Sequence, residues 1–148
     1  AIPEIKIHIV GSNPPQSILD MNSEQMIIHG YVTDEELKRL YQDSRIAFIP
    51  LRYGAGVKGK VIEAMVNGLP VVTTPIGAEG IEGAEEILQC AQTAEELAQT
   101  VLRLYNDEEK LKDLRQEGYK YVMNTFSVSA AKRNLKDVFD FDDGEDGK

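Results

Sequence analysis

Residues 46–74 place an apolar run, a glycine-rich loop, a helical stretch and a second apolar run in succession, and this order constrains the fold most. The loop holds three glycines beside two lysines, and the helical stretch from Lys60 ends at an Asn-Gly pair, residues 67–68. Small residues let a backbone approach an anion closely, and the first N–H groups of a helix point at it. The segment therefore predicts a strand–loop–helix–strand unit whose loop holds a phosphate.

Two known phosphate-binding motifs match this loop only in part. The three glycines spell G-x-G-x-x-G, the dinucleotide pattern, and Glu79 lies about twenty residues further on. That pattern needs its first glycine directly after the strand, whereas residues 51–53 intervene here. The loop also spells G-x-x-x-x-G-K, but Val61 stands where a triphosphate-binding loop needs Ser or Thr for Mg²⁺. Both motifs therefore fit poorly.

The rest of the chain alternates apolar runs with amphipathic stretches, which predicts strands and helices in turn. The run 5–10 is apolar on both faces, as expected of a strand buried within a parallel sheet. Capping boxes at Thr33 and Thr93 and a cap at Asp107 predict three helix starts. This alternation predicts an α/β fold with a doubly wound, mainly parallel sheet. The predicted strands are residues 5–10, 26–29, 46–49, 71–74 and 87–90. Helices are predicted after Thr33, Gly59, Thr93 and Asp107, and a last helix over 129–139. The residues expected to face the core include Leu37, Leu40, Tyr41, Leu97, Leu104, Leu111, Leu114 and Val122.

Length and composition bound the domain count and exclude several functions. At 148 residues, 42% of them hydrophobic, the chain is expected to form one domain, residues 1–139, followed by an acidic disordered tail, residues 140–148. A net charge of −9 argues against a nucleic-acid-binding face. Cys90 is the only cysteine, so there is no disulfide framework and no cysteine-based metal cage. No run reaches membrane-spanning length, and we expect a cytoplasmic protein.

The segment 63–72 resembles the donor-sugar loop of the group 1 (GT4-like) glycosyltransferases, which have the GT-B fold. Glu63-Ala64-Met65, Gly68 and residues 70–72 match the run E-A-M-x-x-G-x-P-V-V of that family position for position. The family also has a first glutamate, which seven intervening residues separate from the E-A-M run. Ala55 stands there instead, so the carboxylate that contacts the sugar is absent. With similar strands and turns before it, the resemblance covers residues 2–105.

The resemblance implies that the chain is the C-terminal half of a two-domain enzyme, a Rossmann-like half of a GT-B fold. Family counterparts begin with one further strand and helix, which carry an Arg and a Lys for the diphosphate, and neither precedes Ala1. The implied partners are a nucleotide sugar and an N-terminal domain of the same protein. A membrane-associated acceptor, and hence a peripheral membrane location, is compatible with this. Family chemistry is sugar transfer with retained configuration, without a required metal or other cofactor, and the isolated chain is expected to be inactive.

The resemblance also implies roles for individual residues. Glu63 would accept hydrogen bonds from both hydroxyls of a ribose. Its structural alternative is a carboxylate in the first turn of a helix, stabilised there by the helix dipole. Tyr31 and Val32 would line the nucleobase or only pack, and Gly11 would form a turn beside the cleft.

The diphosphate would be held by the basic loop. Lys58 and Lys60 would form an electropositive cradle facing Arg52, although a single lysine is ordinarily solvated. Loop backbone groups would complete the cradle, at Gly56, Val57 and Gly59. No catalytic or metal-binding residue is assigned, and the role of Glu79 stays open.

Two other functional classes remain open. One is an enzyme of the same architecture, such as a nucleotide-sugar epimerase or a nicotinamide-dependent dehydrogenase. The other is a non-catalytic GT-B-like binding module, which Ala55 and the lack of the first strand and helix favour. Titration with UDP, GDP and NAD⁺ distinguishes these classes from a glycosyltransferase.

Overall fold

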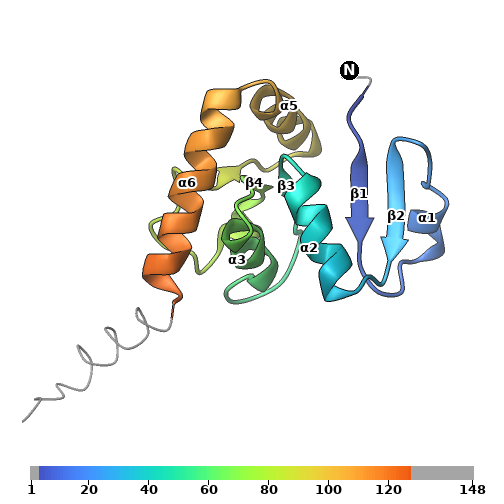
Figure 1. Ribbon diagram of the computed structural model, residues 1–148, viewed down its shortest axis with the longest axis horizontal. Helices are drawn as coiled ribbons and strands as arrows, with labels where there is room; N and C mark the ends of the chain where they lie inside the picture. Colours follow the sequence, from blue (N-terminus) through green and yellow to red (C-terminus); the bar gives the residue numbers. More distant parts are fainter. Residues whose placement is uncertain (1–3, 128–148) are drawn as a thin grey trace, which may run out of the picture.

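The computed structural model describes residues 4–127, which form six helices and five strands (Figure 1). Each predicted strand and the four predicted helices that begin before residue 109 are present. The predicted last helix, 129–139, and the tail lie outside the described residues. In chain order the elements are β1 (Ile7–Val10), α1 (Gln16–Leu19), β2 (Met26–Gly30), α2 (Asp34–Asp43), β3 (Ala47–Ile49), α3 (Gly59–Val66), β4 (Val71–Thr73), α4 (Pro75–Ala78), β5 (Gln89–Cys90), α5 (Ala94–Tyr105) and α6 (Glu108–Thr125).

All strand pairing among these residues is parallel, but the strands form two separate ladders. β1 pairs with β2, while β3, β4 and β5 pair in that order. Parallel strands need a crossover, and α2 supplies one by returning the chain from the end of β2 to the start of β3 (Figure 1). The α/β fold with a parallel sheet is confirmed. The break between β1 and β3 was not expected.

Apolar side chains cover both faces of the β3–β5 sheet. Val71 and Val72 are neighbours on β4 and therefore point to opposite faces. On the face of Val71 the buried group is built around α3 and consists of Val61, Ala64, Met65, Leu69, Val71, Ile81, Ala84, Leu88 and Val122. On the face of Val72 it is built from α5 and the first turns of α6 and consists of Val72, Leu97, Leu104, Leu111 and Leu114. Helices on both faces give the doubly wound arrangement.

The predicted helix caps are all present. The Thr33 hydroxyl accepts a hydrogen bond from the Glu36 N–H, and the Glu36 carboxylate accepts one from the Thr33 N–H. Thr93 and Glu96 form the same reciprocal pair at the start of α5. Each cap satisfies donors that the first helical turn leaves open, which explains why α2 and α5 begin where they do.

Two predictions about burial are wrong. Ile7 in β1 is 43% exposed, although the run 5–10 was expected to be buried on both faces. Among the residues of α2 none is fully buried, and Leu37, Leu40 and Tyr41 are half-buried. The reason is the break in the sheet, because β1 has a neighbouring strand on one side only.

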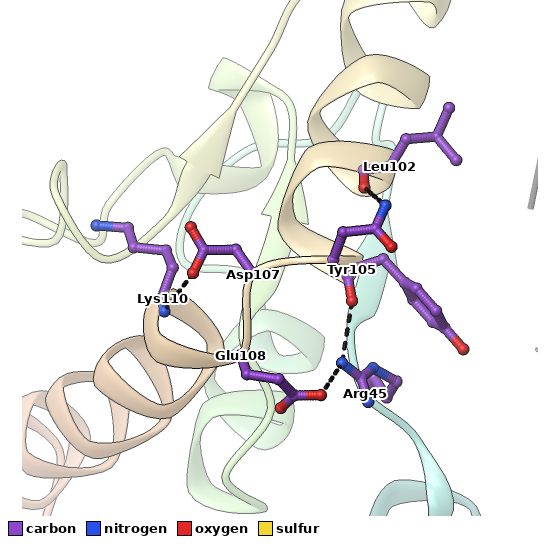
Figure 2. Close-up of polar contacts among 7 residues, drawn as sticks. Arg45, Leu102, Tyr105, Asp107, Glu108 and Lys110 are labelled. Atoms are coloured by element: carbon purple, nitrogen blue, oxygen red, sulfur yellow. Dashed lines mark hydrogen bonds and ion pairs between the residues drawn. The ribbon is translucent and has the colours of Figure 1, made fainter.

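Arg45, two residues before β3, ties the sheet to the corner between α5 and α6 (Figure 2). Its Nη2 donates to the Tyr105 carbonyl at 3.0 Å and pairs with the Glu108 carboxylate at 2.5 Å. The guanidinium also lies 4.7 Å from the centre of the Tyr105 ring. Beside it, Asp107 caps α6 by accepting a hydrogen bond from the Lys110 N–H at 2.9 Å. Arg45 therefore orients the helices that cover one face of the sheet.

Candidate functional site

A glycine-rich loop, residues 52–58, follows the carboxyl end of β3 and leads into α3. Gly54 and Gly56 have φ angles of +132° and +78°, which residues with a side chain rarely adopt. The Thr74 hydroxyl, after β4, donates to the Leu51 carbonyl at 2.5 Å and fixes the point where the loop begins. The loop lies at the sheet edge where open α/β folds bind their ligands.

Lys58 is the N-cap residue of α3 and is only 9% exposed. Its Nζ donates to the Gly56 carbonyl at 2.5 Å and lies 3.5 Å from the Glu79 carboxylate. The ammonium therefore holds the loop in shape, and it would have to exchange one of these partners to reach a phosphate. The ion pair with Lys58 gives Glu79 a structural role, which the sequence left open.

The turn after α4 packs against the same loop. Gly80 has a φ angle of +78°, and a Cβ built there would lie 3.0 Å from Cγ2 of Val57. With the Lys58–Glu79 ion pair, this contact braces the loop at a second point. In the sequence, Gly80 itself was the local sign that the turn after α4 and the loop approach each other closely.

Lys60 is the second residue of α3 and its side chain is exposed. Within residues 4–127 its ammonium has no hydrogen-bond or ion-pair partner, and the N–H groups of Gly59 and Lys60 are also free. The next two N–H groups, of Val61 and Ile62, already bond to the Lys58 carbonyl. Free N–H groups at a helix start beside an exposed lysine attract an anion.

Arg52 lines a cavity at the carboxyl ends of β3 and β4. The cavity has a volume of about 440 Å³ and is lined by Leu51, Arg52, Thr74, Pro75, Ile76 and Gln92. Gln92 follows β5, so segments after three neighbouring parallel strands meet here. The sequence analysis named Arg52 but missed Thr74 and Gln92, which only the strand order brings beside it.

Glu63 is the fifth residue of α3, because the helix begins at Gly59, and it does not lie in the first turn as expected. It is exposed, and its carboxylate lies near the hydroxyl of Tyr41 in α2. Burial, followed by the charge of Glu63, raises the pKa of Tyr41 to about 12. The dipole effect is confined to the first turn, so it does not account for this carboxylate. Tyr41 packs against the core, and no local pattern in the sequence indicates that it also lies near Glu63.

Gly11, Tyr31 and Val32 follow the other two parallel strands. The Gly11 N–H donates to the Gly30 carbonyl at 3.0 Å, which joins the turns after β1 and β2. Tyr31 is 77% exposed and Val32 is half-buried. In the described part of the chain, no hydrogen bond or ion pair joins these three residues to the loop or to Glu63. The predicted site residues thus form two groups, one on each side of the break in the sheet.

The described residues contain neither a cluster of metal ligands nor a membrane-spanning helix. No three His, Cys, Asp or Glu side chains among residues 4–127 come together as metal ligands would. No helix in that range is long and apolar enough to cross a bilayer.

A parallel α/β sheet with helices on both faces and a glycine-rich loop at its carboxyl edge defines a Rossmann-like domain. The family model described as "Glycosyl transferases group 1" matches residues 1–107. The chain therefore belongs to the group 1 glycosyltransferases, and the resemblance seen in the sequence is confirmed. The matched range contains every predicted site residue, including the loop and Glu63.

Relatives and solved structures match this chain over part of their own length. A Klebsiella pneumoniae protein described as "Uncharacterized 44.6 kDa protein in cps region" is 38% identical over 87 residues, which is 53% of this chain and 22% of that protein. Sucrose-phosphate synthase from Thermosynechococcus elongatus superposes with a TM-score of 0.76 at 21% identity, over 94% of this chain and 39% of its own. TarM superposes with a TM-score of 0.71 at 19% identity, over 90% of this chain and 28% of its own. These likenesses confirm the Rossmann-like half of a GT-B fold, and the chain spans less than half of each protein.

Proposed function

We propose that the chain is the donor-binding half of a longer glycosyltransferase and that residues 52–63 hold a nucleotide sugar. The observation that carries this proposal is the glycine-rich loop between β3 and α3, at the carboxyl edge of the sheet, in a chain of the group 1 family. This chain covers only 22–39% of the length of the matched proteins, which supports a longer enzyme. In that enzyme a facing N-terminal domain would bind the acceptor.

The diphosphate binds at the start of α3. Lys60 and the free N–H groups of Gly59 and Lys60 face it, and Arg52 lies on the other side of the loop beside the cavity. Lys58 shapes the loop and contacts the phosphate only after leaving Glu79. When the bond to the sugar breaks, the departing diphosphate gains negative charge, which these fixed positive groups stabilise. In this proposal the transfer retains the anomeric configuration and needs no metal ion.

The nucleoside binds between Glu63 and the turns after β1 and β2. In this proposal the nearby Tyr41 hydroxyl donates to one acceptor position of the Glu63 carboxylate, and the remaining positions accept hydrogen bonds from the two ribose hydroxyls. Tyr31 and Val32 line the nucleobase, beside the turn at Gly11. Tyr41 would orient the carboxylate, because a tyrosine hydroxyl is protonated at neutral pH and can donate to it.

A nucleotide-binding module without catalysis is a second candidate. Ala55 favours it, because the family has its sugar-contacting glutamate at that position. Such a module would bind UDP or GDP but leave the sugar bond intact. Preferential binding of NAD⁺ would instead indicate an epimerase or a dehydrogenase.

The test measures, by calorimetry, the binding of UDP and GDP and of their 2′,3′-dideoxy analogues to the longer enzyme and its Glu63→Ala variant. Hydrogen bonds to a charged group contribute about 1.5–3 kcal/mol each, and two bonds to one carboxylate are not additive. We therefore expect Glu63→Ala to cost about 2–4 kcal/mol, which weakens binding of the better nucleotide about 30- to 1000-fold. The wild type should prefer the natural nucleotide over its dideoxy analogue. The variant should bind both equally, because only Glu63 reads the hydroxyls.

Glu117→Ala is the matched control. Glu117 is also an exposed helical carboxylate, it lies on α6, and it pairs with Lys120 at 3.2 Å. The control should leave nucleotide binding unchanged. If Glu63→Ala binds both nucleotides normally but melts at a lower temperature, Glu63 serves the fold through Tyr41 and the proposed role is wrong.

A further inference from the structure

Two histidines touch each other across β1 and β2, which lie side by side in Figure 1. Nδ1 of His8 lies 2.9 Å from Nε2 of His29. The ring centres are 5.2 Å apart, and the ring planes make an angle of 22°. This separation is close to the largest that such a nitrogen–nitrogen contact allows, so the rings meet end to end and the two nitrogens point at each other. The contact is therefore a hydrogen bond between two imidazoles.

The pair bridges an irregularity in the β1–β2 ladder. Val10 pairs with Gly30, one residue further along β2 than a regular ladder would place it, so His29 has no register partner. An extra residue of this kind bends its strand and re-aims its side chain. Here the side chain reaches His8, and the next residue, Gly30, accepts a hydrogen bond from the Gly11 N–H at 3.0 Å. The histidine pair therefore braces the strands where they turn into the candidate site.

The hydrogen bond limits how many protons the pair can hold. A neutral imidazole has one N–H and one lone pair, whereas an imidazolium has two N–H groups and no free lone pair. With both rings neutral, one ring donates its N–H and the other accepts with its lone pair. A first added proton binds to the outer nitrogen of the donating ring, and the hydrogen bond becomes charge-assisted and stronger. Among residues 4–127 neither outer nitrogen has a hydrogen-bond partner, so both are available to water.

A second added proton has one place left, the lone pair that accepts the hydrogen bond. Its arrival leaves two N–H groups and two positive charges facing each other where the contact was 2.9 Å. Like charges at such a distance disfavour the doubly charged state. The pair therefore keeps its hydrogen bond with no added proton or with one, and loses it with two.

Charged side chains near the pair come from two segments. Lys6, before β1, opposes a positive charge on His8, whereas Asp43, at the end of α2, favours one. Glu36, in the first turn of α2, interacts with the charge of His29. Burial is the largest cause that lowers the pKa of His8, followed by the charges of His29 and Lys6. Two carboxylates against one ammonium allow one positive charge on the pair, but the second still meets the first.

We propose that His8 and His29 form a proton-operated clamp, which holds the bulge at the end of β2 at neutral pH and releases it when both rings are protonated. The clamp lies where the backbone ladder is irregular, so its release removes one of the contacts that hold the turns after β1 and β2 together. Bulges occur often beside active sites, where they direct particular side chains.

The clamp has a consequence for the candidate site. The turns that it braces hold Gly11, Tyr31 and Val32, where the proposed function places the nucleobase. We therefore expect the nucleoside to bind more weakly once the clamp is released. This consequence rests on the proposed function, whereas the clamp itself rests only on the two histidines and the ladder.

The test is an NMR pH titration of residues 1–148 without nucleotide, between about pH 8 and about pH 4.5. It follows the ring signals of His8 and His29, which are the only histidines of the chain, and the amide of Gly11. We expect the rings to titrate in two steps separated by more than about one pH unit, because the pair resists its second proton. The Gly11 amide should shift mainly in the second step, when the clamp is released.

His8→Asn and His29→Asn are the matched variants. Each removes one titrating ring but keeps the carboxylates Glu36 and Asp43, and two variants at different strands guard against a fold defect in either. The remaining histidine should titrate in a single step, and the acid shift of the Gly11 amide should disappear.

Two outcomes overturn the clamp. A single common step for both rings in the wild type would show that the second proton meets no resistance. An unchanged acid shift of the Gly11 amide in both variants would show that a carboxylate causes it. Because no nucleotide is present, failure of the proposed function leaves this result unchanged.

Discussion

Gly77 has no room for a side chain, and this limit fixes how α4 meets the sheet. A Cβ there would lie 1.9 Å from Oγ1 of Thr73. That hydroxyl donates to the carbonyl of Ile49, the last residue of β3, at 2.7 Å. Gly77 therefore lets α4 begin directly against the carboxyl ends of β3 and β4, next to the cavity that Arg52 lines.

Gly77→Ala should destabilise the domain. The added methyl group forces the Thr73 side chain to rotate and to break its hydrogen bond with Ile49, and overpacking of this kind costs about 1–3 kcal/mol. Gly59→Ala is the control, because Gly59 is also helical and nothing lies within 4 Å of its Cβ position. It should leave stability unchanged or raise it by up to about 1 kcal/mol. Urea unfolding measures both, and equal stabilities would show that Thr73 accommodates the methyl group freely.

Residue types predicted the position of the glycine-rich loop in the fold but not which of its residues touch. The glycines and lysines predicted an anion site in that loop, and the structure places the loop directly before α3. The sequence analysis had Lys58 facing the phosphate, whereas its ammonium is buried against Gly56 and Glu79. Glu79 is 21 residues away, and no local pattern reports a contact over that distance.

At the scale of elements, Arg45 should matter more than its ion-pair partner. Arg45→Ala removes the hydrogen bond to the Tyr105 carbonyl and the contact with the Tyr105 ring, so we expect a loss of about 2 kcal/mol. Glu108→Ala removes only an ion pair whose carboxylate side chain is 77% exposed, and it should cost at most about 1 kcal/mol. Chemical denaturation of the two variants measures this difference. Equal losses would mean that the ion pair, not the Tyr105 contacts, holds the α5–α6 corner.

Elements with local signals were predicted best. The starts of α2, α5 and α6 follow from capping residues within the first turn, and all three were predicted from the sequence. The four-residue helices α1 and α4 were missed, because each is too short to show an apolar period. The burial of β1 was wrong for a non-local reason, since its periodicity cannot report whether a second neighbouring strand is present.

At the scale of the whole molecule, the proposed function makes this chain one wall of a divided site. The loop 52–58 with Glu63 lies on one side of the break, and Gly11, Tyr31 and Val32 lie on the other. Sugar transfer needs acceptor and donor held in near-attack geometry, which contributes about 7–11 kcal/mol. We therefore expect residues 1–148 alone to bind a nucleotide only weakly, with Kd in roughly the high-micromolar to millimolar range, and to transfer no sugar.

The most direct test of this account is an NMR titration of residues 1–148 with UDP and GDP and with their nucleosides, at about 0.01 M and about 1 M salt. At low salt one of the two diphosphates should bind more tightly than its nucleoside and should shift the amide signals of residues 56–63. At high salt the difference should shrink, because exposed charges at Lys60 and Arg52 are screened. Equal affinity of diphosphate and nucleoside at low salt, or shifts confined to residues outside the loop and α3, would contradict the proposal that this loop binds the donor.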